Sequence, residues 1–176
     1  MRKSSIGLTK SLWNDDKRYI DNYWSVIKDY WVHGDLASRD ADGHWYLHGR
    51  SDDTIKVSGK RIGPSELESV IVKSGKAKEV AAVGIPDENK GSKIILSIVP
   101  AENNDQKESF FEDLVIKDLG KSFKPDKVIF VKDLPKTRNM KIMRRVIKSC
   151  LANQDPGDLS TLLNPESVEE IRSHAI

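Results

Sequence analysis

The pattern of apolar and polar positions predicts a chain that alternates between short strands and helices. Alternation around the turn dipeptide Asp42-Gly43 predicts a β-hairpin over 36–50. A second, shorter hairpin is predicted where 54–57 alternates as a strand and 58–61 turns the chain, before Gly63-Pro64 ends it.

A helix is predicted directly after the second hairpin. Ser65 can act as its N-cap, with Glu68 three residues later as the capping-box partner. Leu67 and Ile71 lie one helical turn apart and supply an apolar face, and the dipeptide 74–75 ends the helix.

The rest of the chain predicts three strands and two helices. Short apolar runs predict strands over 80–85, 93–99 and 128–131. Amphipathic spacing predicts helices over 105–119 and 142–151. The outer face of the last helix is expected to carry Arg144, Arg145 and Lys148. This order of elements predicts a small α+β layer fold, with a β-hairpin and a three-stranded sheet flanked by helices.

The two ends of the chain differ from this central region. Residues 1–34 are rich in aromatic side chains but contain no clear helix or strand, and so many rings normally pack against a large surface. The polar stretch 154–176 contains Pro and Gly and is expected to form an extended arm. We therefore expect three parts, with the first ending at residue 50 and the second covering 51–153.

Composition narrows the class of protein. A chain of 176 residues with 38% hydrophobic and 32% charged residues can build a modest core beneath a well-solvated surface. The net charge of +2 gives no indication of a nucleic-acid or membrane partner. The single cysteine, Cys150, excludes an internal disulfide, and no cysteine–histidine cluster suggests a metal site. No apolar run is long enough to cross a bilayer and no secretory signal is present, so a cytoplasmic location is expected.

Four polar clusters are candidates for chemistry, and each has an ordinary alternative. The carboxylate of Asp35 can accept hydrogen bonds from vicinal hydroxyls, although Gly-Asp pairs are common in turns. Arg50 can reach a phosphate or a ribose, or pair with a neighbouring aspartate. Gly59 lets a ligand approach the backbone at a hairpin tip beside the charge of Arg61, or simply turns the hairpin.

The fourth cluster is a basic loop, 134–145, which runs into the last helix. A lysine in such a loop is a compact charge on a flexible stem and can follow a phosphoryl or carboxylate oxygen as charge develops. The alternative is a nucleic-acid-binding patch. That patch would consist of Lys136, Arg138, Lys141, Arg144 and Arg145.

The order and spacing of these clusters resemble a known family. The run GDLASRDADGHWYLHGRSDDTIKVSGKRIGPSELE resembles the hinge region of AMP-forming adenylating enzymes, and PKTRNMKIMRR resembles their C-terminal lysine motif. The ending GDLSTLLNPESVEEI is similar to the tail of acetyl-CoA synthetases. The resemblance covers essentially the whole chain and identifies it with the C-terminal lid of an acyl-CoA synthetase, preceded by a remnant of the large N-terminal domain.

The resemblance implies a two-step ligase reaction. A carboxylate and ATP give an acyl-adenylate and pyrophosphate, and coenzyme A then displaces AMP to form the thioester. ATP or AMP, coenzyme A and Mg²⁺ are the implied cofactors, at a site mostly outside this chain. The implied partner is an N-terminal adenylating domain, and the implied substrate is acetate or another short or medium acyl acid. The chain alone is expected to be inactive.

The resemblance also implies residue roles. Asp35 and Arg50 would bind the ribose of the nucleotide, and Asp52 would be the hinge at which the backbone swings. Lys141 would be the catalytic lysine of adenylation. Lys141 would also be a target of acetylation, which would remove its positive charge and so switch off adenylation.

The second half-reaction involves the hairpin tip. Ser58 and Gly59 would line the pantetheine tunnel, and Arg61 would approach the phosphate of the adenylate. One departure from the family pattern concerns the lysine loop, where Asn139-Met140 replaces the usual Ser-Gly and the loop loses a glycine.

Two alternatives belong to other classes of protein. The chain could be a non-enzymatic module that binds nucleotide, coenzyme A or a protein partner, with the aromatic segment 13–31 as its interface or as a site of self-association. The other alternative, that the basic loop binds nucleic acid, is weaker, because the net charge is near neutral and the lysine motif explains the loop better.

Overall fold

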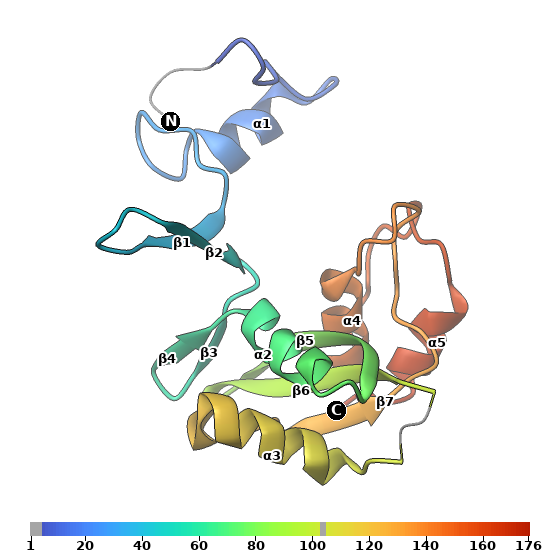
Figure 1. Cartoon of the computed structure of the whole chain (residues 1–176). Helices are drawn as coiled ribbons and strands as arrows, with labels where there is room; N and C mark the ends of the chain where they lie inside the picture. The colour runs from blue at the N-terminus through green and yellow to red at the C-terminus, as the bar shows by residue number, and fades with distance from the viewer. Residues whose placement is uncertain (1–4, 103–104) are drawn as a thin grey trace.

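A computed structural model describes residues 5–102 and 105–176 of the chain. In Figure 1 the N-terminal part forms an extension that leads through a hairpin into a domain of one sheet with helices on both sides. The predicted α+β class is confirmed. No helix among the described residues is long and apolar enough to cross a membrane.

The N-terminal extension contains a helix that the sequence pattern did not predict. Helix α1 (Asp16–Tyr23) is capped by Asp15, whose side chain accepts a backbone hydrogen bond in the first turn. Tyr19 is buried, and Tyr23 stacks on Trp31 with ring centroids 5.4 Å apart. The aromatic residues thus pack partly on one another. The expectation of no helix in this region was wrong, because α1 is short and polar and its apolar residues do not repeat regularly.

The first predicted hairpin is confirmed. Strands β1 (Asp35–Arg39) and β2 (Trp45–Arg50) pair antiparallel, with an irregularity in register near the start of β1. Large apolar side chains of this hairpin lie in solvent, and the Trp45 and Leu47 side chains are 68% and 76% exposed. The hairpin is therefore not covered by the domain that follows it.

The second predicted hairpin is also confirmed. Strands β3 (Ile55–Val57) and β4 (Lys60–Ile62) are joined by a two-residue turn. Both turn residues have positive φ, 49° at Ser58 and 80° at Gly59, as tight hairpin turns that match the strand twist require. The Ser58 amide donates to the Lys90 carbonyl at 2.9 Å, which fixes the tip against the domain.

The following helix begins earlier than predicted. Helix α2 (Pro64–Lys73) has Gly63 as its N-cap, and the Glu66 side chain accepts from the Gly63 amide at 3.0 Å. The predicted capping pair of Ser65 and Glu68 was wrong. Proline suits the first helical position, where no amide hydrogen bond is lost, so the helix includes Pro64 and Ser65 lies inside it.

The central sheet has the order β5-β6-β7. Strands β5 (Ala77–Asp87) and β6 (Gly91–Pro100) are antiparallel and extend beyond the predicted runs on both sides. Strand β7 (Lys127–Phe130) pairs parallel with β6, and α3 (Glu108–Leu119) and the short 3₁₀ helix η1 (Lys121–Phe123) make the crossover between them.

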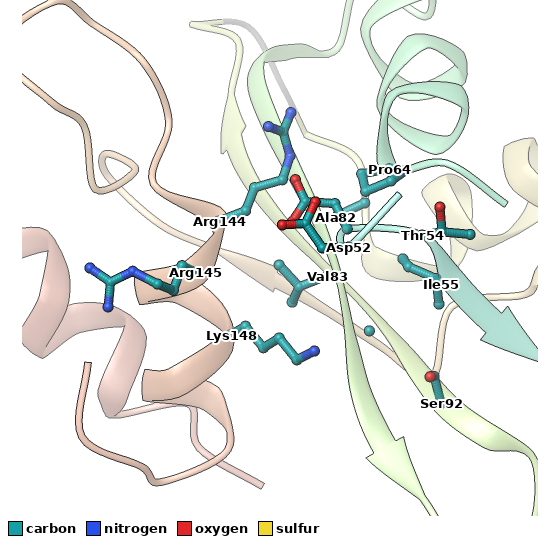
Figure 2. Close-up of a pocket in the computed structure, with 12 residues that line it drawn as sticks. Asp52, Thr54, Ile55, Pro64, Ala82, Val83, Ser92, Arg144, Arg145 and Lys148 are labelled. Carbon is teal, nitrogen blue, oxygen red and sulfur yellow. The ribbon is translucent and has the colours of Figure 1, made fainter. Parts of the chain in front are cut away.

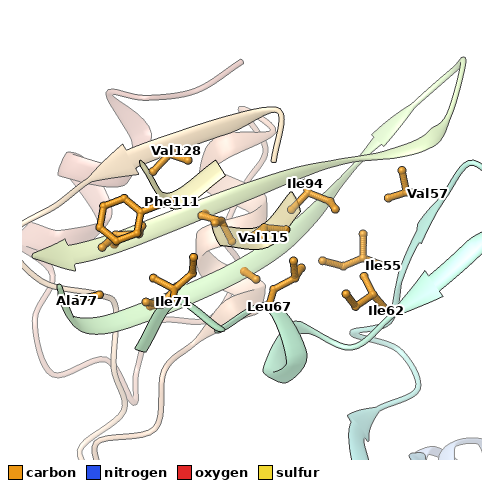
Figure 3. Close-up of a cluster of buried hydrophobic side chains, with 14 residues drawn as sticks. Ile55, Val57, Ile62, Leu67, Ile71, Ala77, Ile94, Phe111, Val115 and Val128 are labelled. Atoms are coloured by element: carbon orange, nitrogen blue, oxygen red, sulfur yellow. The ribbon is translucent and has the colours of Figure 1, made fainter. Parts of the chain in front are cut away.

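Side chains of β6 alternate between two hydrophobic cores. Ile94, Leu96 and Ile98 face the core under α2 and α3, where Leu67 and Phe111 are fully buried (Figure 3). The other face of the sheet packs against α4 and α5, and its core contains the buried side chains of Ile95, Val99, Val146, Ile147, Leu151 and Ile171. Because both faces of the sheet are covered, its strands appear as continuous apolar runs in the sequence.

Two expectations for the C-terminal part need correction. Helix α4 (Arg144–Leu151) forms as predicted, but Arg144 is half-buried rather than on an outer face. The tail is extended only before α5 (Glu166–Arg172), which packs on α4 through the buried Val168 and Ile171. The spacing of these two apolar residues, three apart after Pro165, is a helix signal that the polarity of the stretch obscured.

Candidate functional site

Asp35 and Asp52 are linked by the guanidinium of Arg50. Arg50 Nε donates to Asp52 Oδ1 at 3.0 Å, and Arg50 Nη1 lies 3.7 Å from Asp35 Oδ1. Arg50 Nη1 also donates to the His33 carbonyl at 2.8 Å. The hydrogen bond with Asp52 raises the pKa of Arg50 despite partial desolvation, and it lowers the pKa of the Asp52 carboxyl. The two nucleotide-site candidates and the hinge candidate therefore form one charged network.

Strand register explains why this network forms. Asp35 and Arg50 are direct partners across β1 and β2, so their side chains start from neighbouring positions. Gly34, at φ 86°, leaves room for the guanidinium, because a Cβ there would lie 3.0 Å from Arg50 Nη2. The sequence contains these residues in the right order, but only pairing of the strands places them in contact.

A small cavity of about 70 Å³ lies between the segment that precedes β3 and the start of α4 (Figure 2). Asp52 and Thr54 line it from that segment, and Arg144, Arg145 and Lys148 line it from α4. The pKa of Arg144 is raised, first by its hydrogen bond with Glu68 and further by the nearby charge of Asp53. The hinge candidate thus faces a basic helix end in this arrangement.

The three candidates at the second hairpin lie together but apart from this network. Ser58, Gly59 and Arg61 are all exposed, and Arg61 is paired in register with Lys56. A Cβ at Gly59 would have no described atom within 4 Å. The backbone at Gly59 is thus exposed at the hairpin tip, and its contact with a ligand stays a prediction.

Lys141 lies in an exposed turn between β7 and α4. The Met140 amide donates to the Thr137 carbonyl at 2.8 Å, and Met140 has φ 60°, in the region that favours glycine. The loop therefore keeps a left-handed position where the family pattern has glycine, and methionine occupies it at some conformational cost.

The hairpin tip and the lysine turn occupy different ends of the domain. In Figure 1 the β3–β4 hairpin lies at one end, beyond α2, whereas the loop between β7 and α4 lies near α5 at the other. The structure therefore brings Asp35, Arg50 and Asp52 together and leaves Lys141 and Gly59 on separate surfaces.

Sequence reasoning missed the structural roles of two basic residues. Lys136 is 6% exposed and lies 2.6 Å from Asp133 Oδ1 and 2.7 Å from Glu79 Oε2. Burial alone would lower the pKa of Lys136, but the hydrogen bonds with the two carboxylates outweigh it and raise this pKa. Arg144 is likewise paired, with Glu68. Neither cation is available to a nucleic acid, which weakens the basic-patch alternative.

The turn of the first hairpin gathers further polar groups that the sequence analysis did not single out. Potential metal-ligand atoms of Asp40, Asp42 and His44 lie within 4.8 Å of one another. Hydrogen bonds inside the turn account for this grouping, because Asp40 accepts from the His44 amide at 2.8 Å and from the Tyr46 hydroxyl at 3.0 Å.

The chain is similar in sequence to known proteins over most of its length. Residues 66–141 match the family model of the AMP-binding enzyme C-terminal domain. The chain is 42% identical over 171 residues to an acetyl-coenzyme A synthetase of Methanothrix thermoacetophila, covering 93% of this chain and 26% of the relative. It is 36% identical over 175 residues to a propionate–CoA ligase of Escherichia coli, covering 94% of this chain and 28% of that one.

The fold is also found among solved structures. An acetoacetyl-CoA synthetase from Streptomyces lividans superposes with a TM-score of 0.78 over 90% of this chain and 24% of that chain, at 21% identity. The family match and the fold together indicate the C-terminal domain of an AMP-binding enzyme. Residues 66–141 belong to the AMP-binding enzyme C-terminal domain family, and the chain is homologous to the C-terminal part of acetyl-CoA synthetases and propionate–CoA ligases. It spans about a quarter of the length of the curated relatives it matches.

Proposed function

We propose that this chain is the mobile lid of an AMP-forming acyl-CoA synthetase and acts together with an N-terminal adenylating domain. The observation that carries the proposal is the separation of the exposed Lys141 turn and the exposed Gly59 tip on one lid that is joined to its hinge at Asp52. Rotation about the hinge would present these two surfaces in turn, as in enzymes whose lids complete the active site.

In the first half-reaction, a carboxylate oxygen of the acyl acid attacks the α-phosphorus of ATP and pyrophosphate leaves. The Lys141 ammonium is suited to this step, because it is exposed on a tight turn and carries a compact charge. It would stabilise the negative charge shared by the carboxylate and the α-phosphate in the transition state. Asp35 would accept hydrogen bonds from the ribose hydroxyls, with Arg50 orienting its carboxylate.

In the second half-reaction, the thiol sulfur of coenzyme A attacks the acyl carbon and AMP leaves. The bare backbone at Ser58 and Gly59 would admit the pantetheine arm, and Arg61 would face the adenylate phosphate. Mg²⁺ would arrive with ATP and be held largely by the adenylating domain. The substrate we propose is acetate or another short or medium acyl acid, in keeping with the acetyl- and propionyl-specific names of the relatives.

The exposed face of the first hairpin supports the proposed partner. Trp45 and Leu47 lie in solvent on β2. In the Methanothrix thermoacetophila relative, about three quarters of the sequence lies outside the region that matches this chain. Apolar side chains at this density normally mark an interface. We propose that the adenylating domain covers them.

The test is reconstitution. The chain would be mixed with the N-terminal body of the Methanothrix thermoacetophila relative, prepared without its own C-terminal part, and acetyl-CoA formation measured with ATP, acetate and coenzyme A. We expect activity in the mixture and none in either part alone, and we expect Lys141→Ala to slow acetyl-CoA formation by about 10²–10³. A mixture that stays inactive, although the two parts bind one another, would overturn the enzymatic proposal.

Exposed aromatic residues of the N-terminal extension support a second candidate, a non-enzymatic binding module that self-associates or binds a protein. Trp13 is 93% exposed, at one end of the aromatic segment 13–31. Sedimentation of the chain alone distinguishes the candidates, because self-association through this segment would make the mass depend on concentration and on Trp13→Ser. A monomer that binds the adenylating body favours the lid.

A further inference from the structure

The turn that carries Lys141 is closed at its base by the run 136–138. The Thr137 amide donates to the Lys141 carbonyl at 2.9 Å, and the Lys141 amide donates back to Thr137 Oγ1 at 3.2 Å. Lys136 pairs with Ile142 one step further from the tip. These contacts fix the shape of the turn, and its position on the domain depends on what holds the run 136–138 from the other side.

The C-terminal segment 161–164 holds that other side. The Leu163 amide donates to the Lys136 carbonyl at 2.8 Å, and the Arg138 amide donates to the Thr161 carbonyl at 3.2 Å. The run between Lys136 and Arg138 is thus the middle one of three adjacent backbone segments. The lysine turn lies on one side of it and the C-terminal segment on the other.

The side chain of Asn164 connects the C-terminal segment to the residues that precede the lysine turn. It is 7% exposed, and its side-chain oxygen accepts from the Lys136 amide at 3.0 Å. Its Nδ2 donates to Asp133 Oδ2 at 2.7 Å and to the Leu134 carbonyl at 2.8 Å. The Ser167 hydroxyl donates to the Asn164 carbonyl at 2.7 Å, which ties the residue to the start of α5. Both ends of the amide are therefore satisfied.

Ionic contacts connect Asn164 to the central sheet. Asp133, which accepts from Asn164, also pairs with the buried ammonium of Lys136, and Lys136 pairs in turn with Glu79 on β5. Loss of Asn164 would leave a carboxylate, a carbonyl and an amide short of partners in a largely buried place. The run that supports the lysine turn would then lose its side-chain link to the start of α5, and the Asp133 and Lys136 contacts that join it to the sheet would be weakened.

We infer that Asn164 is a positioning residue for Lys141, and that the C-terminal segment 161–164 holds the lysine turn in place. Asn164 does not touch the reacting atoms and acts through Lys136 and Asp133 on the turn. For catalysis the inference rests on the proposed function of Lys141. Misplacement of a catalytic group by about 1 Å can cost about a hundredfold in rate. The hydrogen bonds of Asn164 should therefore affect the rate of adenylation as well as the stability of the fold.

The first test needs no catalysis and uses the whole chain alone. Amide hydrogen exchange would be compared between the parent and Asn164→Ala. We expect exchange within 137–143 to rise at least about tenfold while amides of β5 and β6 keep their rates, because the missing contacts hold the turn and not the central sheet. Leu163→Ala is the matched control, since the Leu163 side chain is exposed and the substitution keeps the backbone amide that donates to the Lys136 carbonyl.

A milder variant covers the case in which Asn164→Ala does not fold. Asn164→Gln keeps both hydrogen-bonding ends of the amide on a side chain that is one methylene longer, so we expect some of the contacts to survive and a smaller rise confined to the same turn. Unchanged exchange in the turn, or an equal rise throughout the sheet, would overturn the inference, because Asn164 would then be neutral or merely stabilise the domain.

The second test uses the reconstituted pair and separates the two half-reactions. With Asn164→Ala we expect kcat for adenylation to fall about tenfold or more at an unchanged KM for ATP, and thioester formation from added acyl-adenylate to keep its rate. Equal loss in both half-reactions would contradict a positioning role. If the parental pair is itself inactive, the proposed function fails, while the exchange experiment still decides whether Asn164 holds the turn.

Discussion

Arg144 at the start of α4 donates two hydrogen bonds to Glu68 on α2, from Nε to Oε1 at 2.8 Å and from Nη2 to Oε2 at 2.6 Å. Glu68 Oε1 also accepts from the Ala82 amide of β5 at 3.0 Å. One carboxylate thus joins the two helices to the sheet between them. It also fixes the helix that directly follows the lysine turn.

This relationship predicts a stability effect. Glu68→Ala should lower the free energy of unfolding by about 2 kcal/mol, because the change leaves the half-buried Arg144 and the Ala82 amide without their partner. Glu68→Gln should cost less, since it keeps an acceptor. Urea unfolding of the chain would measure both, with the exposed Glu169→Ala as a control. Equal midpoints for parent and Glu68→Ala would show that the pair contributes nothing net.

Lys141 should act on one half-reaction. In the reconstituted pair, Lys141→Ala should slow adenylation by about 10²–10³, the range for loss of one charge-stabilising donor, and spare thioester formation from added acyl-adenylate. Pyrophosphate release and acyl-CoA formation measure the two steps. Lys78→Ala, an exposed lysine on β5, is the control. The assignment is wrong if both steps slow equally.

Gly59 should act on the other half-reaction. Gly59→Leu should impair thioester formation while adenylation continues, because the side chain would occupy the space offered to the pantetheine arm. Gly75→Leu is a matched control: Gly75 follows α2, has φ 70° and would also meet no described atom within 4 Å. The backbone strain is therefore comparable at the two sites. If both variants lose thioester formation alike, strain and not obstruction is the cause.

The Asp133–Lys136 pair predicts a pH dependence of stability. Burial alone would raise the pKa of Asp133, but hydrogen bonds from Lys136, the Leu134 amide and Asn164 outweigh it and place this pKa below 3.8. A lowered folded-state pKa stabilises the fold above the unfolded value, and this contribution is lost as pH falls through the folded value. The pKa of Lys136 is raised, so its own contribution is present at neutral pH and is lost only at strongly alkaline pH.

Asp133→Asn tests this dependence. The variant should be less stable than the parent at about pH 7, and the difference should shrink as the pH is lowered below about 3.8, where the parental carboxylate is protonated on unfolding. Urea midpoints of the two proteins across this range measure it. A difference that stays constant down to about pH 2 would mean that the Asp133 charge does not contribute.

Local sequence signals were sufficient for the hairpins and for the family. The turn Asp42-Gly43 and the Ser58-Gly59 pair fix strand pairing through backbone conformations that few other residues adopt. The apolar runs of β5 and β6 also stood out, because both faces of the sheet are covered. The candidates Asp35, Arg50 and Lys141 were found from their motifs, since the order of polar residues is a property of the chain itself.

Tertiary structure decided what those residues touch. The sequence does not indicate that Glu68 binds Arg144 rather than capping its own helix, because the two residues are 76 positions apart and meet only when α2 and α4 pack near the same strand. The role of Asn164 depends likewise on a tail that returns to the lysine turn. Strand pairing and turn conformation depend on neighbours in the chain, so the sequence determined them; partners of buried charges depend on long-range packing, which only the folded chain specifies.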